Sequence, residues 1–129
     1  MSSPKKVILS ADAPQPLSVY SQAIQSGSLL FLAGQIPLDA ASGELVSGSL
    51  ESETDCIIRN MSAVLKAAGA SLENVVKTTV YLTNMADFAD FNAAYARHFP
   101  SAPPARTTVA VAALPRGVRI EIEAIAALP

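Results

Sequence analysis

Only two stretches of this 129-residue chain repeat hydrophobic residues at helical spacing, and this scarcity of helices limits the possible folds most. The first follows Ser49, a suitable N-cap, and ends near Gly69; its periodic residues are Ile57, Met61, Val64, Leu65 and Ala68. The second carries Phe88, Phe91, Asn92 and Tyr95 on one stripe and ends at Phe99-Pro100. Everything else that is regular is predicted to be strand.

The strand signals lie before, between and after these helices. Val76 to Leu82 alternates more apolar with more polar residues, which predicts a strand. Val7-Ile8-Leu9 predicts an edge strand, closed by a proline-containing loop at 10–16. Two hairpins are also predicted: the first joins 20–24 to 29–33 through 25–28 and is followed by a loop at 39–43, and the second joins 106–112 to 119–126 around 114–117.

This order of elements predicts one α+β domain over residues 1–129, with a mixed, mostly antiparallel sheet of about six strands. Two helices cover one face of such a sheet and leave the other bare. That second face is expected to be rich in Val, Ile and Ala and to be wet in a monomer. Subunits are therefore expected to pack sheet against sheet around a shared axis.

Charge and composition exclude several function classes. The net charge is −2, so the chain has no field that attracts nucleic acid or an acidic membrane. Cys56, the single cysteine, cannot form an intramolecular disulfide, and the first six residues do not resemble a signal peptide. No apolar run has the roughly 20 residues of a membrane span. A soluble, cytoplasmic protein is expected.

Familiar catalytic and cofactor motifs are missing from the sequence. His98 is the only histidine and sits near a helix end, where surface exposure or pairing is its usual role. Cys56 is expected to be inert packing. The 6 glycines are dispersed, so neither a phosphate-binding loop nor a dinucleotide fingerprint is present. No metal and no cofactor are predicted.

Six ordered segments together resemble the YjgF/Rid family, and the resemblance runs nearly end to end. They are Tyr20-Ser21-Gln22-Ala23, Gly34-Gln35-Ile36-Pro37, Lys77-Thr78-Thr79-Val80, Asp87-Phe88-x-x-x-Asn92, Pro104-Ala105-Arg106 and Ile120-Glu121-Ile122-Glu123-Ala124-Ile125-Ala126. The resemblance implies a chorismate-mutase-like α+β fold, a homotrimer and ligand clefts between neighbouring subunits. It also implies hydrolysis of 2-aminoacrylate and related enamines or imines, which leak from pyridoxal-phosphate enzymes, to 2-keto acids and ammonia.

The resemblance also implies the site. Arg106 matches the family's carboxylate-binding arginine; Tyr20, Asn92 and Glu121 match other cleft positions, and Gly34 matches a backbone donor near the substrate. Three positions depart from the family pattern. Ser18-Val19 replaces Gly-Pro before the tyrosine, Ala33 stands where serine is frequent, and Thr108 stands where cysteine is frequent. Ala33 and Thr108 are therefore expected to alter substrate contacts.

The residue chemistry suits this expectation. The planar fork of Arg106 can hold a carboxylate through two parallel hydrogen bonds, which lysine cannot do. Glu121 and Tyr20 are the candidates for positioning water and moving protons. Alternation along the strand predicts Arg106 and Thr108 on one face. If the last hairpin folds about Arg116, Glu121 lies roughly 15 Å along the sheet from Arg106, so the two would not meet within one chain.

Simpler interpretations stay open for each residue. Arg106 could be a surface arginine paired with an acid, and Glu121 and Glu123 a solvated strand face, with Glu123 structural. Tyr20 could be a half-buried strand residue, and Asn92 a brace between a helix and a loop. Two other functions compete with hydrolysis: a non-catalytic metabolite-binding or chaperone-like role, and a ribonuclease or translation-inhibitor activity that the low aromatic content disfavours.

Overall fold

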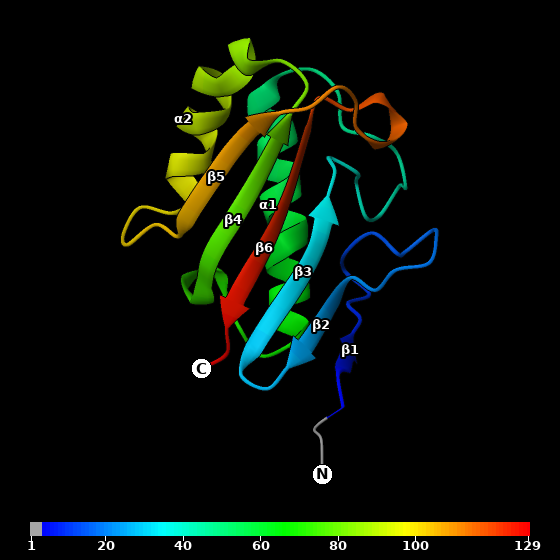
Figure 1. Ribbon diagram of the computed structural model, residues 1–129. Helices are drawn as coiled ribbons and strands as arrows, with labels where there is room; N and C mark the ends of the chain where they lie inside the picture. The colour runs from blue at the N-terminus through cyan, green and yellow to red at the C-terminus, as the bar shows by residue number, and fades with distance from the viewer. Residues whose placement is uncertain (1–3) are drawn as a thin grey trace.

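One six-stranded sheet forms the centre of the molecule, in the order β1-β2-β3-β6-β4-β5 (Figure 1). The computed structural model describes residues 4–129. Its strands are β1 (Lys6–Ile8), β2 (Ala23–Ser26), β3 (Leu29–Gln35), β4 (Val75–Leu82), β5 (Ala105–Ala110) and β6 (Ile120–Ala127). All neighbours pair antiparallel except β4 and β5, which are parallel. The predicted α+β class and mixed six-stranded sheet are confirmed.

Two helices, α1 (Leu50–Ala67) and α2 (Phe88–His98), cover the same face of the sheet, as Figure 1 shows. The predicted ends of α1 are confirmed. Ser49 Oγ accepts a hydrogen bond from the Ser52 amide at 3.0 Å, and Gly69, with φ of 79°, follows the last turn. Three short 3₁₀ turns complete the chain: η1 (Leu72–Asn74), η2 (Met85–Asp87) and η3 (Pro115–Gly117).

The predicted last hairpin is wrong. β5 and β6 are not paired with each other: β5 lies at the edge of the sheet beside β4, and β6 lies between β3 and β4. Burial explains the arrangement, because alternate residues of β6 are almost fully buried: Ile120, Ile122, Ala124 and Ala126. A strand with such a face belongs in the centre of the sheet, whereas β5 has no buried residue and suits an edge.

Three smaller predictions also need correction. The strand expected from Tyr20 begins only at Ala23, so Tyr20 lies in the preceding loop, 51% exposed. A tight turn at Gly27-Ser28 closes this hairpin, and Gly27 has φ of 60°. In β4, a register shift between Val75 and Lys77 turns Val76 outward, because a bulge breaks the alternation of sides.

The hydrophobic core lies between the sheet and the two helices. Its fully buried members include Leu30, Ile57, Phe91 and Ile122. The bare face of the sheet is more polar than predicted, because Lys77, Thr79, Tyr81, Glu121 and Glu123 alternate there with the buried residues of β4 and β6. Among residues 4–129, no helix combines the length and the apolar character that crossing a membrane requires.

Candidate functional site

Arg106 lies near the start of β5 and turns toward α2. Its guanidinium carbon is 5.5, 5.4 and 4.8 Å from the ring centroids of Phe88, Phe91 and Tyr95. A guanidinium within about 6 Å of an aromatic ring centroid is attracted by the negative charge on the ring face. These rings therefore hold the cation without using any of its N–H groups.

Asn92 fixes one end of the same guanidinium. Arg106 Nη1 donates a hydrogen bond to Asn92 Oδ1 at 2.8 Å. None of the ion pairs within residues 4–129 includes Arg106, so the simpler interpretation of a surface arginine paired with an acid has no support here. The other N–H groups of Arg106 make no hydrogen bond within residues 4–129, so they can bind an anion.

An open pocket of about 380 Å³ borders this arginine and is called the Arg106 pocket below. It is lined by Asn92, Tyr95, Ala96, Phe99, Pro103, Pro104 and Arg106. Most of these side chains are apolar, and they lower the local dielectric around the guanidinium. A charge-assisted hydrogen bond is stronger there than in bulk water. The pocket therefore offers one oriented cation beside an apolar wall.

Thr108 follows Arg106 by two residues on the same strand, so both side chains leave β5 on one side. Thr108 Oγ1 is shielded from solvent and has no hydrogen-bond partner within residues 4–129. A buried hydroxyl left without a partner costs about 1–3 kcal/mol. This atom is a candidate contact for a ligand or for a neighbouring subunit.

A second pocket, of about 370 Å³, lies on the bare face of the sheet and is called the Glu121 pocket. Its lining residues are Ser18, Tyr20, Ala33, Gly34, Ile36, Pro115 and Glu121. Burial raises the pKa of the Glu121 carboxyl, and the negative charge of Glu123 raises it further. A carboxyl with a raised pKa exchanges its proton closer to neutral pH, as an acid–base catalyst must.

The absence of a side chain at Gly34 leaves room for the Glu121 carboxylate. A Cβ atom there would collide with Glu121 Oε2, because the carboxylate packs directly on the Gly34 backbone. The register between β3 and β6 shifts between Leu32 and Gln35, and this irregularity contains both Ala33 and Gly34. The Gly34 backbone and the Glu121 carboxylate therefore lie close enough for one ligand in this pocket to contact both.

Tyr20 reaches the Glu121 pocket from a loop. Its amide donates to the Ser18 carbonyl at 3.0 Å, so Ser18-Val19 forms a tight turn where the family pattern has Gly-Pro. The tyrosine side chain is half exposed in the monomer. Its phenol is therefore available to a ligand or to a neighbouring copy.

The two pockets lie on opposite faces of the sheet. Arg106 contacts α2, whereas Glu121 lies between Ile120 and Ile122, whose side chains are buried beneath the helices. The expected register is wrong in detail: Arg106 pairs with Thr78 of β4 and not with β6. Within one chain, the predicted site residues form two separate groups: Arg106 and Asn92 line one pocket, and Tyr20, Ala33, Gly34 and Glu121 line the other. Thr108 lines neither pocket; it lies on β5 on the same side as Arg106.

Sequence reasoning missed two features. The sequence places Phe88, Phe91 and Tyr95 on one stripe of α2, but the stripe was not predicted to hold a cation. The signal was incomplete, because only the parallel pairing of β5 with β4 places Arg106 beside these rings. Glu123 was expected to be structural, yet it lies two residues from Glu121 and influences its pKa.

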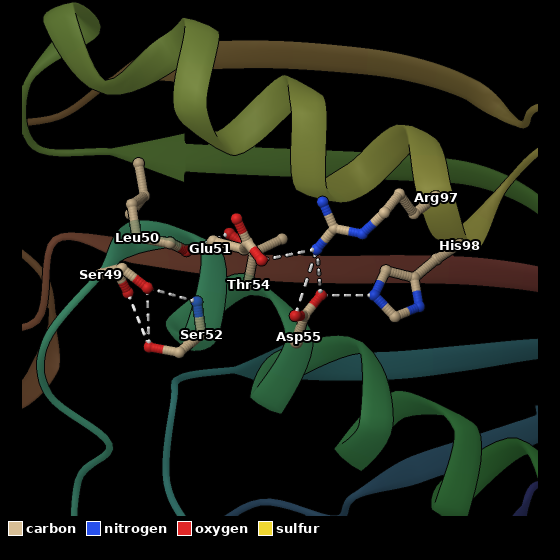
Figure 2. A network of polar contacts seen from close by, with 8 residues as sticks. All are labelled: Ser49, Leu50, Glu51, Ser52, Thr54, Asp55, Arg97 and His98. Atoms are coloured by element: carbon tan, nitrogen blue, oxygen red, sulfur yellow. Dashed lines mark hydrogen bonds and ion pairs between the residues drawn. The ribbon is translucent and has the colours of Figure 1, made fainter.

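A polar network joins the outer surfaces of α1 and α2, as Figure 2 shows. Asp55 contacts His98 Nε2 at 2.7 Å and Arg97 Nη2 at 3.3 Å, and Arg97 also reaches Glu51 at 3.4 Å. This is the pairing role expected for His98. Cys56 is a free, buried cysteine. Within the described range 4–129, no group of three His, Cys, Asp or Glu side chains is arranged to hold a metal ion.

Comparison with known proteins connects this geometry to one family. The family model described as endoribonuclease L-PSP matches residues 10–128. A RutC family protein of Pyrococcus horikoshii is 51% identical over 122 residues, which cover 95% of this chain and 97% of that protein. The human protein named 2-iminobutanoate/2-iminopropanoate deaminase is 47% identical over 122 residues, covering 95% of this chain and 89% of its own.

Solved structures agree with the sequence matches. The crystal structure of E. coli TdcF with bound serine superposes with a TM-score of 0.92 at 35% identity. It covers 96% of this chain and 99% of its own. The fold, the motifs and these matches together show that the chain belongs to the endoribonuclease L-PSP family, the YjgF/Rid family that its sequence resembles.

Proposed function

We propose that this protein hydrolyses 2-imino acids, and the enamines that give rise to them, such as 2-aminoacrylate, to 2-keto acids and ammonia. The observation that carries the proposal is Arg106, a guanidinium held by Asn92 and three rings, with no acidic partner among residues 4–129. Such a group binds a carboxylate through two parallel hydrogen bonds. The name of the human relative and the serine bound to TdcF support a small amino-acid-derived substrate.

Hydrolysis of the imine needs one water and two proton movements. Water adds to C2, the C=N electron pair moves to nitrogen, and nitrogen takes up a proton. In the resulting carbinolamine the hydroxyl proton passes to nitrogen, the C–N bond breaks as the C=O bond forms, and ammonia leaves. Glu121, whose pKa is raised by burial, accepts the water proton and returns it to nitrogen, while the Tyr20 hydroxyl orients the water. Arg106 holds the substrate carboxylate and so orients the C=N group toward the water, which lowers the barrier further.

The two pockets must come together for this chemistry. We propose that a homotrimer does so, with Glu121, Tyr20 and Gly34 of one copy facing Arg106 and Asn92 of the next. Leu29 and Phe31 are 40% and 42% exposed, an apolar surface that a neighbour would cover. Sedimentation equilibrium should give three times the chain mass, and a stable monomer at micromolar concentration would contradict the shared site.

The decisive experiment couples a serine or threonine dehydratase to this protein and follows loss of the imine together with formation of the keto acid. Arg106→Lys keeps the charge and loses the fork, so kcat/KM should fall about 10- to 100-fold, as expected for loss of a charged hydrogen bond. In Arg106→Ala, which also loses the charge, kcat/KM should fall further. Arg97→Ala removes a half-exposed arginine of the α1–α2 network and serves as the matched control.

Two other results would redirect the assignment. Calorimetric binding of a 2-keto or 2-amino acid without turnover would favour a metabolite-binding role. Cleavage of RNA by the wild type, lost in Arg106→Ala, would favour the activity that the family description names. Imine loss at the uncatalysed rate, with either dehydratase, would refute the proposed hydrolysis.

A further inference from the structure

A buried pair of hydroxyl groups lies next to the Arg106 pocket. Thr78 Oγ1 of β4 and the phenol oxygen of Tyr95 on α2 are 2.7 Å apart, a hydrogen bond in which either group can donate. Thr78 is fully buried and Tyr95 is only 4% exposed, so this bond is shielded from solvent. Thr78 belongs to one of the six family motifs, yet the chemistry proposed above gives it no role.

The sheet places Thr78 directly beside Arg106. The two residues are partners across the parallel β4–β5 ladder, so their side chains leave the sheet on the same side. Tyr95 contacts both of them. Its hydroxyl bonds Thr78, and its ring centroid is 4.8 Å from the Arg106 guanidinium carbon, closer than the centroids of Phe88 and Phe91.

The Tyr95 ring is held at its sides by aromatic contacts and at its tip by the hydroxyl. The centroids of the Phe91 and Phe99 rings lie 5.3 and 4.7 Å from its own, within the range of attractive aromatic pairs. Such pairs tolerate a range of tilts, whereas a hydrogen bond of 2.7 Å restricts both distance and angle. The bond to Thr78 is therefore the directional contact that fixes how the ring face meets the guanidinium.

We propose that Thr78 is a positioning residue: its hydroxyl anchors the Tyr95 phenol, and the anchored ring holds the Arg106 guanidinium in the plane in which it binds a carboxylate. Thr78 itself touches no ligand. The hydrogen bond from Asn92 fixes Arg106 at Nη1 alone, so a second constraint is needed to stop the fork from tilting about that bond. The inference rests on the proposed function only in taking the bound carboxylate to be that of the substrate.

A double replacement separates this role from simple satisfaction of two buried hydroxyls. Thr78→Val leaves the Tyr95 hydroxyl without its partner in the core, so the urea midpoint should fall. Thr78→Val combined with Tyr95→Phe removes both hydroxyls and keeps side chains of nearly the same shape, so the midpoint should return close to wild type. If the pair is purely structural, carboxylate binding returns together with stability. If the pair positions Arg106, stability returns and binding does not.

NMR signals of Arg106 test the inference without any activity. Protons of the Arg106 side chain that lie over aromatic ring faces are shifted by the ring currents, and Arg106→Lys identifies these signals by their loss. In the double variant, and in Tyr95→Phe alone, the signals should move toward their positions in an unstructured arginine. Signals that stay in place in the double variant overturn the inference, and Tyr95→Phe decides if the double variant does not fold.

Thr54→Val is the matched control. It removes an equally buried threonine hydroxyl, which donates to the Leu50 carbonyl at 2.8 Å within α1, away from the Arg106 pocket. The Arg106 signals should not change in this variant. Thr78→Ser keeps the hydroxyl at the site and should retain both the wild-type signals and the wild-type KM.

Imine hydrolysis provides the second readout. Arg106 holds the carboxylate in the ground state and in the transition state alike, so a weakened ring contact should raise KM about 3- to 10-fold in the double variant and leave kcat within about twofold. An unchanged KM overturns the inference as well. If the wild type hydrolyses no imine, the proposed function fails while the NMR signals still decide this inference. If the imine is hydrolysed and the double variant keeps the wild-type signals and KM, only this inference fails.

Discussion

Replacing Asn92 with Asp is the sharpest test of the Arg106 pocket. The change is almost isosteric and keeps an oxygen where Asn92 Oδ1 accepts from Arg106 Nη1 at 2.8 Å. It also adds a negative charge beside the guanidinium. The substrate carboxylate would then approach an arginine that is already neutralised. We expect KM for a 2-imino acid to rise strongly, with a smaller effect on kcat.

The magnitude follows from Coulomb's law. Two carboxylates that flank one guanidinium lie about 6 Å apart, and at an effective dielectric constant of about 20 they repel by about 2.8 kcal/mol. Arg106 is only partly buried, so solvent screening leaves between about half and all of this repulsion, or about 1.4–2.8 kcal/mol. Each 1.4 kcal/mol is a factor of ten, which gives a KM increase of about 10- to 100-fold.

The assay is steady-state hydrolysis of an imine generated in the cuvette, at low and at high salt. Added salt should reduce the Asn92→Asp defect, because it screens the new charge. Asn92→Ala, which removes the brace without adding charge, should raise KM less. The free energy of unfolding of Asn92→Asp, measured by thermal unfolding, should differ from wild type by less than about 1 kcal/mol, because an ion pair replaces a hydrogen bond. An unchanged KM in a folded Asn92→Asp variant would refute carboxylate binding by Arg106.

Three further variants test other parts of the structure. Gly34→Ala should displace the Glu121 carboxylate and lower kcat at least about tenfold, while circular dichroism and urea unfolding stay close to wild type. An unchanged kcat would show that the contact between the Gly34 backbone and the Glu121 carboxylate is not needed for activity. Glu53→Ala should lower the free energy of unfolding in urea by about 2 kcal/mol. The loss is smaller than for a fully buried pair because the partner Arg119, 2.6 Å from Glu53, is 39% exposed and can be hydrated. Glu51→Ala, at the surface, should lower it by under about 0.5 kcal/mol, and equal losses would contradict this expectation. Glu121→Gln should increase the free energy of unfolding at pH 7. Because the folded-state pKa of Glu121 is raised, the contribution of this carboxyl to wild-type stability is fully present below the unfolded pKa of about 4.3 and is lost as pH rises through the folded pKa. The gain in the variant should therefore vanish near pH 4, and a gain that grows on acidification would contradict this sign.

Local order was accessible from the sequence because it depends on neighbouring residues. The Ser49 cap, the Gly69 stop and the stripe of α2 each reflect interactions within a few positions, and the structure confirms them. The alternating apolar residues of β6 likewise predicted a strand. The order of these elements predicted the α+β class, and the six family motifs implied the same class, because ordered segments constrain a whole chain more than any single pattern does.

Strand order was not accessible in the same way. Two strands separated by a short turn normally pair, and this preference led to the wrong last hairpin. Competition for burial decided otherwise: the inward residues of β6, from Ile120 to Ala126, need neighbours on both sides, and only the position between β3 and β4 supplies them.

The sequence by itself determined which side chains are able to bind a carboxylate or exchange a proton, since the guanidinium of Arg106 and the carboxyl of Glu121 have these properties in any fold. Tertiary structure alone decided their surroundings. Long-range packing placed Arg106 among the rings of α2 and against Asn92, and it placed Glu121 on the opposite face, over Gly34 and beside Glu123. Electrostatic environment depends on what surrounds a group in space, and spacing along the chain does not contain that information.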